Sequence, residues 1–68
     1  MTLGKFISHI KHNSVCINLV NNEYLYSIWS GDIGSYKHWI HKDKYDDKVI
    51  NSISCNFNDV MIIYLEGE

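Results

Sequence analysis

The chain has 68 residues, 46% of them hydrophobic, which is enough for one small domain spanning residues 1–68. Six lysines, no arginine and eight acidic residues give a net charge of −2, so the chain lacks the basic surface that sequence-independent nucleic-acid binding needs. The longest apolar run, Val60–Leu65, is far shorter than the ~20 residues of a membrane-spanning helix. We therefore expect a cytoplasmic protein with neither a nucleic-acid nor a membrane partner.

The two cysteines, Cys16 and Cys55, are predicted to be buried thiols. They could form at most one disulfide, and no signal peptide precedes them, which favours a reducing compartment. A domain of this length buries only about 60% of the surface that its unfolded chain exposes. The fold is therefore expected to be marginal unless a metal or a partner adds stability.

A short amphipathic helix is predicted from about Leu3 to His12. Thr2 precedes it as a candidate N-cap, and Asn13 follows it as a residue that tolerates a left-handed closing conformation. The apolar residues at helical spacing on one side are Leu3, Phe6, Ile7 and Ile10.

A hairpin is predicted next, with strands Val15–Val20 and Tyr24–Trp29 joined at Asn21-Asn22. A two-residue turn there would place Leu19 opposite Tyr24, Ile17 opposite Tyr26 and Val15 opposite Ile28. The tyrosines would then help to fill the core. A slip of one residue would exchange the two faces of the pair.

Ser30–Asp32 is expected to end the second strand because it contains a glycine and two turn-forming residues. Asp32 or Ser35 could then cap a short helix over about Ser35–His41. The polar and charged segment Lys42–Asp47 is predicted to be an exposed loop.

Two further strands are predicted at Val49–Phe57 and Val60–Leu65, joined by turn-forming residues at Asn56–Asp59. The last strand is apolar at every position, so both of its faces should be covered. We expect it to be a central strand, or an edge that meets a second subunit.

These elements predict an α+β domain of order α-β-β-α-β-β. The sheet would have four strands and be mainly antiparallel, with the first helix packed on one face. The connection through the second helix could instead make one strand pair parallel. We see no internal repeat and no linker.

The order of these features resembles small uncharacterised accessory proteins of bacteriophages and prophages from AT-rich Gram-positive bacteria. The segments that carry the resemblance are TLGKFISHI, VCINLV, YLYSIWSGDI, YDDKVINSI and VMIIYL. The resemblance covers nearly the whole chain and rests on hydrophobic patterns. It implies no enzymatic role, and some accessory proteins of this size inhibit host defence, anti-CRISPR proteins among them. The excess of acidic residues here is too small for DNA mimicry.

The histidines are the only candidate metal ligands with a regular spacing. His9 and His12, like His38 and His41, are separated by three positions, which would bring each pair together on a helix face. Two such pairs could bind zinc, but the chain has no CxxC or HExxH motif, and solvated surface histidines are the simpler interpretation. No cofactor is expected.

No catalytic residues are predicted. A histidine could activate Ser8, Ser35 or Cys16, yet no nucleophile elbow accompanies them. The acidic residues near Lys42 lie among lysines, where solvated carboxylates keep ordinary pKa values. The GxxG spacing at Gly31 lacks the basic residues of a phosphate or RNA clamp.

The aromatic residues near the second helix are the candidate protein-binding residues: Trp29, Tyr36, Trp39 and Tyr45. Tyr and Trp are frequent at binding hot spots because they offer a large contact area at low entropic cost. In so small a domain they could instead close the open end of the core.

The sequence therefore predicts a non-enzymatic accessory protein that binds a host protein or protein complex, and the resemblance extends this to inhibition of a defence system such as CRISPR-Cas. One alternative is a structural or assembly protein that acts as a homodimer, joined by the last strand or by the aromatic segment. The other alternative is a small zinc-binding module built on the histidine pairs.

Overall fold

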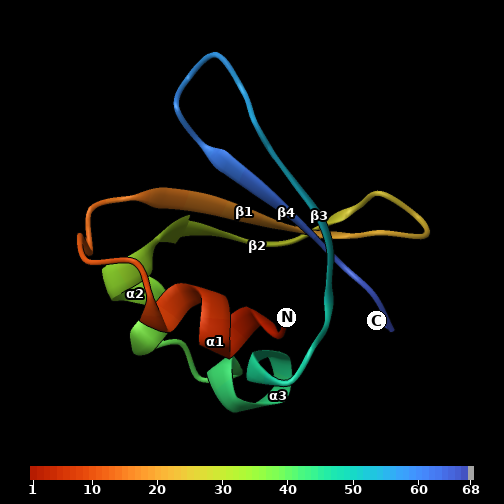
Figure 1. Ribbon diagram of the computed structural model, residues 1–68, viewed down its shortest axis with the longest axis horizontal. Helices are drawn as coiled ribbons and strands as arrows, with labels where there is room; N and C mark the ends of the chain where they lie inside the picture. Colours follow the sequence, from red (N-terminus) through yellow and green to blue (C-terminus); the bar gives the residue numbers. More distant parts are fainter. Residues whose placement is uncertain (68) are drawn as a thin grey trace.

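A four-stranded sheet and three short helices make up the fold, as the computed structural model shows for residues 1–67 (Figure 1). The predicted α+β class is confirmed, with one helix more than expected. The elements in chain order are α1 (Leu3–Ser8), β1 (Cys16–Asn21), β2 (Ser27–Asp32), α2 (Ile33–Lys37), α3 (Lys42–Asp46), β3 (Ile50–Cys55) and β4 (Met61–Leu65).

The sheet is mixed, with the strand order β2-β1-β4-β3. The two outer pairs, β1–β2 and β3–β4, are antiparallel hairpins, whereas the central pair β1–β4 is parallel. The helical connection leads from β2 to the outer strand β3, and the second hairpin then places β4 beside β1 and parallel to it. The expectation that the last strand is central is confirmed.

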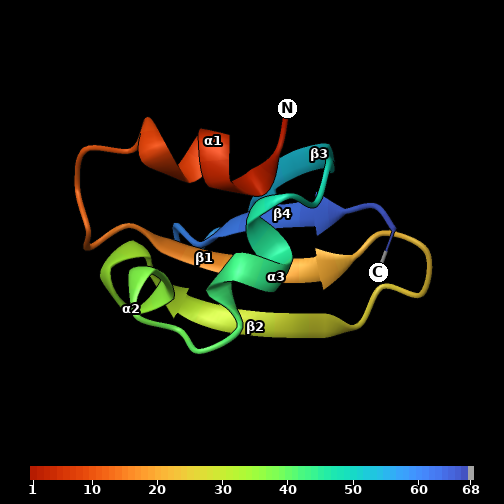
Figure 2. The same cartoon turned by 90° about the horizontal axis from the view of Figure 1, so that it is seen from below.

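The three helices all lie on one face of the sheet (Figure 2). Between them and the sheet lies a core of nine buried residues: Leu3, Ile7, Ile17, Leu19, Ile33, Tyr36, Tyr45, Ile63 and Leu65. The prediction that both faces of β4 are covered is wrong, since Ile62 and Tyr64 alternate with the core residues and are only half-buried. One covered face is sufficient because the sheet is largely antiparallel.

The predicted register of the first hairpin is wrong. Leu19 lies opposite Trp29, and Ile17 lies opposite Gly31. The loop is longer than two residues, so Tyr24 and Tyr26 lie outside the strands and do not fill the core.

The hydrogen bonds of Asn21 explain why the loop between β1 and β2 is longer than the predicted two-residue turn. This residue ends β1 and is 2% exposed, and its side-chain Oδ1 accepts hydrogen bonds from the backbone N–H groups of Glu23 (2.9 Å) and Tyr24 (2.7 Å). The Asn21 backbone is also bonded at both groups, to the Tyr26 carbonyl and the Leu25 amide. These bonds form a wider turn than the tight hairpin that an Asn-Asn pair predicts.

Replacing Asn21 with alanine should lower the free energy of unfolding by about 1–2 kcal/mol, because two backbone N–H groups lose their acceptor at a buried position. Urea denaturation would measure the change. Asn22→Ala is a matched control, because its bond to the Leu65 carbonyl is made by the backbone N–H, which alanine retains, and it should change stability by less than about 0.5 kcal/mol. Equal effects of the two substitutions would contradict this role of Asn21.

The strand β2 continues through Ser30–Asp32, so the predicted break at Gly31 is wrong. Gly31 pairs with Ile17 of β1 within the strand. It has a positive φ of 158°, and the Trp29 ring lies where a Cβ atom would be. The cap prediction is confirmed for Asp32, whose carboxylate accepts the Ser35 N–H at 2.6 Å. This bond lowers the pKa of Asp32. The second helix begins at Ile33 and ends at Lys37, four residues before His41.

The helix α1 ends at Ser8 and not at His12. The Ser8 hydroxyl and the His9 Nδ1 both lie 2.7 Å from the Lys5 carbonyl, and such local side-chain bonds compete with helix continuation. Thr2 is the N-cap residue, but its side chain makes no capping bond. The predicted left-handed closure at Asn13 is also wrong, since the positive-φ residues other than glycine within residues 1–67 are Leu25 and Asp59.

The segment predicted as an exposed loop forms the helix α3, with the buried Tyr45 on its inner side. Lys42 and Asp46 are one helical turn apart and form an ion pair at 2.6 Å, which favours a helix. Gly4 of α1 lies against α3, where a Cβ atom would come within 3.0 Å of the Asp46 Cβ.

The second hairpin follows the prediction, with a turn at Asn56–Asp59 in which the Asn56 Oδ1 accepts the N–H groups of Asn58 and Val60.

The predicted burial of the cysteines is wrong, because Cys16 and Cys55 are both exposed free thiols. They begin or end strands at positions that the helices do not cover, so strand register and not hydrophobicity determines their exposure.

Candidate functional site

The four predicted aromatic residues come together in one array. Trp39 stacks with Trp29 at a ring-centroid distance of 5.4 Å and with Tyr45 at 5.2 Å. Tyr36 meets Trp29 edge to face at 5.7 Å. The array joins β2, α2, the connection after α2 and α3 on the helical side of the sheet. Such geometries add about 0.5–1.5 kcal/mol per pair to the hydrophobic effect.

A polar network links Tyr36 of this array to α3. The Tyr36 hydroxyl donates to the Asp46 carboxylate at 2.8 Å, and the second oxygen of that carboxylate binds the Lys42 ammonium at 2.6 Å. Burial, with the nearby Asp46 carboxylate, raises the pKa of Tyr36 far above its ordinary value, so the hydroxyl remains a donor. A cavity of about 370 Å³ beside it is lined by Gly4, Ile7, Ser8, Tyr36, Lys37, Lys42 and Asp46.

Burial divides the array into core and rim. Tyr36 and Tyr45 belong to the buried core, so their side chains offer little surface to a partner. Trp29 and Trp39 are half-buried and pack against the core from outside. The packing of these two tryptophans is compatible with a cap on the core, and their exposed parts are the surface that the array offers to a partner. Ile40, next to Trp39, is exposed.

The histidine pairs do not lie on helix faces, because α1 ends before His9 and α2 ends before His38. All four histidines are exposed. Within residues 1–67, no group of three or more His, Cys, Asp or Glu residues is placed to hold a metal ion. The premise of the zinc module, two helical pairs that meet, is therefore wrong.

The loop between β1 and β2 carries a surface feature that sequence reasoning missed. Three consecutive large side chains are exposed there: Tyr24 is 71% exposed, Leu25 66% and Tyr26 48%. We call Glu23–Tyr26 the recognition loop. Folding leaves these residues in water although they are among the most favourable to bury, which marks a candidate interaction site.

The backbone of the recognition loop is held in an unusual conformation. Leu25 has a φ of 59°, in the left-handed region that branched and bulky residues rarely adopt. Its N–H bonds the Asn21 carbonyl at 2.8 Å, and Asn21 also binds the two preceding residues of the loop. Strain of this kind persists where the surrounding structure enforces it and is often found at functional sites. The only sequence signal for this loop was the run Tyr-Leu-Tyr, whose alternation also fits a strand.

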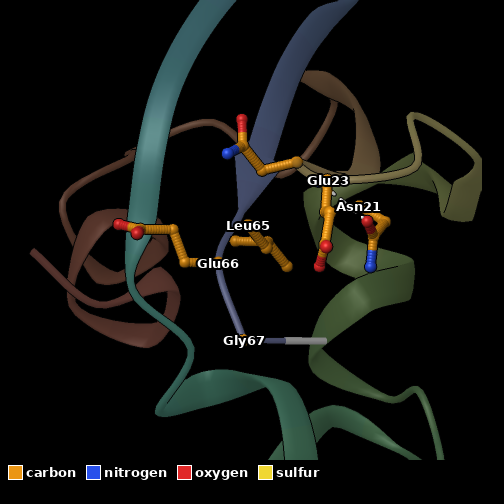
Figure 3. Close-up of a pocket in the computed structure, with 6 residues that line it drawn as sticks. Asn21, Glu23, Leu65, Glu66 and Gly67 are labelled. Atoms are coloured by element: carbon orange, nitrogen blue, oxygen red, sulfur yellow. Dashed lines mark hydrogen bonds between the residues drawn. The ribbon is translucent and has the colours of Figure 1, made fainter.

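A cavity of about 300 Å³ lies beside the recognition loop (Figure 3). It is formed where the parallel strands β1 and β4 end at the same edge, and Asn22 joins them by donating its N–H to the Leu65 carbonyl. Its lining residues are Asn21, Asn22, Glu23, Leu65, Glu66 and Gly67. Glu23 and Glu66 make the lining acidic, with their side chains pointing in different directions from the two strand ends (Figure 3). The loop and this cavity together offer apolar contact area beside negative charge.

No protein-family model matches the chain, and no curated protein or solved structure shows significant similarity to it. In the part of the chain that the structure describes, no helix is long and apolar enough to cross a membrane.

Proposed function

We propose that this protein acts by binding another protein through the recognition loop. The observation that carries the proposal is the exposure of Tyr24, Leu25 and Tyr26 on a backbone that the buried Asn21 holds in place. Tyrosine supplies a large, amphipathic contact area with few rotatable bonds. Because the loop is already ordered, little conformational entropy is lost when a partner binds.

The chemistry around the loop indicates the kind of partner surface that would fit. Tyr24 and Leu25 need an apolar groove, while Glu23 and Glu66 at the adjacent cavity favour a lysine or arginine nearby. The partner surface would therefore combine an apolar centre with a basic rim. An interaction of this kind requires no cofactor and no reaction.

The resemblance to phage and prophage accessory proteins suggests where such a partner is found. In that setting the partner is a host protein or protein complex, and binding would block it. A defence system such as CRISPR-Cas is the target class that we propose to examine first. This part of the proposal rests on the hydrophobic pattern of the sequence and not on the geometry of the loop.

Replacing Leu25 with glycine should separate binding from stability. Glycine adopts a positive φ without strain, so the substitution should leave the free energy of unfolding unchanged or raise it by up to about 1 kcal/mol. The same substitution removes an exposed side chain from the centre of the proposed surface, and should weaken partner binding at least about tenfold. Urea denaturation and affinity capture from a Gram-positive bacterial extract, followed by titration of the captured protein, would measure both effects.

Phe57→Ala provides a matched control, because Phe57 is 94% exposed at the tip of the other hairpin. It removes a large exposed side chain remote in sequence from the loop and should leave capture unchanged. Trp39→Ala tests the rim of the aromatic array in the same experiment. A partner that Leu25→Gly and Tyr24→Ala retain, but Trp39→Ala loses, would overturn the assignment to the recognition loop.

A further inference from the structure

The outer edge of β3 is the most exposed edge of the sheet. Five of the six β3 residues are exposed, compared with two of six in the opposite edge strand β2. The tip of the β3–β4 hairpin extends away from the helices, so they do not cover this edge there (Figure 1). The exposed side chains include the apolar Ile53.

This edge also lacks the usual protection against strand pairing. Edge strands commonly carry lysine, proline or a bulge that prevents another strand from adding. Between Lys48 and Asp59 the chain has no charged residue and no proline. Its one irregularity lies between Ile50 and Ser52, which leaves Ser52–Cys55 regular. We call Ser52–Cys55 the open stretch.

The chain itself shows that the edge accepts an added strand. Thr2 forms an antiparallel bridge with Val49, the Leu3 N–H bonds the Lys48 carbonyl, and the Ile50 N–H bonds the Met1 carbonyl, both at 2.9 Å. The first residues thus cover the beginning of the edge as far as Ile50. Beyond that point no other described segment continues the pairing.

The peptide groups of the open stretch are placed for such pairing. The Asn56 N–H bonds the Val60 carbonyl across the hairpin at 3.1 Å. Peptide groups in an antiparallel strand are directed alternately to its two sides, so those of Ser54 and Ser52 are also directed at β4. The peptide groups of Ile53 and Cys55 are therefore directed outward, away from β4.

We propose that the open stretch pairs with the same stretch of a second copy of this chain, in an antiparallel arrangement about a two-fold axis at Ser54. Ile53 of each copy then lies opposite Cys55 of the other, with both outward-directed peptide groups satisfied. Met1 at one end and the turn that begins at Asn56 at the other end leave room for this register. The two sheets join into one sheet of eight strands, and the recognition loop takes no part in the contact.

The open stretch suits a second copy better than an unrelated strand. No residue between Lys48 and Asp59 is charged, so antiparallel pairing of two copies places no like charges opposite each other. When a foreign peptide adds to a sheet edge, pockets for its side chains give the specificity. Neither of the two cavities is lined by a β3 residue, so this edge offers no such pocket there. Because the contact is short, we expect a dissociation constant in the micromolar range, on the order of 10–100 µM.

Sedimentation velocity of the purified full chain, from about 5 to 500 µM, tests this dimer across the expected range. Wild type should change from monomer to dimer. Ser54→Lys places two ammonium groups at the axis and should weaken dimerisation at least tenfold. Ser30→Lys, at an exposed position of the opposite edge strand β2, should dimerise like wild type. A monomeric wild type at every concentration, or a Ser54→Lys variant that dimerises normally, would overturn the proposal.

A cross-link tests the register. In a Cys16→Ser, Cys55→Ser background, Ser54→Cys should form a covalent dimer on mild oxidation, because Cα atoms of such non-hydrogen-bonded pairs lie about 4.5 Å apart, within disulfide range. Ser30→Cys in the same background should remain monomeric. Equal cross-linking of the two variants would refute pairing at β3. Leu25→Gly should dimerise normally, so failure of the dimer and failure of the recognition loop are separate results.

Discussion

Replacing Gly31 with valine should lower the free energy of unfolding by about 2–4 kcal/mol. A Cβ atom at this position would lie 2.9 Å from Cη2 and Cζ2 of Trp29, closer than van der Waals contact allows. The ring cannot move away freely because it stacks on Trp39 and meets Tyr36 at its edge. The positive φ of Gly31 adds backbone strain for a β-branched residue. Chemical denaturation would measure the loss.

The neighbouring substitution Ser30→Val is the control for this prediction. Ser30 is an exposed residue of the same strand, where valine is a favourable β-former, so its effect should stay within about 0.5 kcal/mol. Near-ultraviolet circular dichroism should show a loss of the tryptophan signal in Gly31→Val and no change in Ser30→Val. If Gly31→Val kept both its stability and its tryptophan spectrum, the packing of Trp29 over Gly31 would be incorrect.

Replacing Tyr36 with alanine should have the largest effect on stability, about 3–5 kcal/mol. The ring is fully buried between the sheet and the helices, and its removal leaves a void that neighbouring rings cannot fill without losing their stacking. Since a domain of this size has only about 5 kcal/mol of stability in total, the variant should be largely unfolded at 37 °C. Thermal melting followed by far-ultraviolet circular dichroism would show it.

Tyr36→Phe distinguishes the ring from its hydroxyl. This variant keeps the packing and removes the hydroxyl's bond to Asp46, together with its longer contact to the Lys42 carbonyl at 3.4 Å. Asp46 still pairs with Lys42, so the cost should be about 1–2 kcal/mol. Tyr26→Ala is the exposed counterpart and should have little effect. A Tyr36→Phe variant as unstable as Tyr36→Ala would show that the polar network, and not the packing, holds α2 to α3.

These experiments depend on features that the sequence could not predict. The four aromatic residues were singled out because of their type, and the structure does bring them together. Their burial could not be predicted, because it depends on the helix α3. The segment Lys42–Asp47 has five charged residues out of six, which is the composition of a loop. The helix forms because Tyr45 packs against the core and one charged pair lies along its surface.

The recognition loop was missed for a related reason. Tyr24 and Tyr26 alternate with other residues as in a strand, and the Asn21-Asn22 pair favours a tight turn. The loop conformation depends on Asn21, which is buried, pairs with Leu65 of β4, and accepts two loop N–H groups with its side chain. No local pattern reports a contact between residues that are more than forty positions apart in the chain.

The α+β class and the second hairpin with its turn could be predicted from the sequence, whereas the last strand was predicted to be either central or an edge at a second subunit, and the structure makes it central. These features follow from local chemistry: helical or alternating periodicity, turn residues at Asn56–Asp59, and a strand that is apolar throughout. The register of the first hairpin, the parallel pairing of β1 with β4, the third helix and the exposure of both cysteines became known only from the folded structure. Each of these depends on which distant residues compete for the same buried space and the same hydrogen bonds, and that competition is settled only when the whole chain has folded.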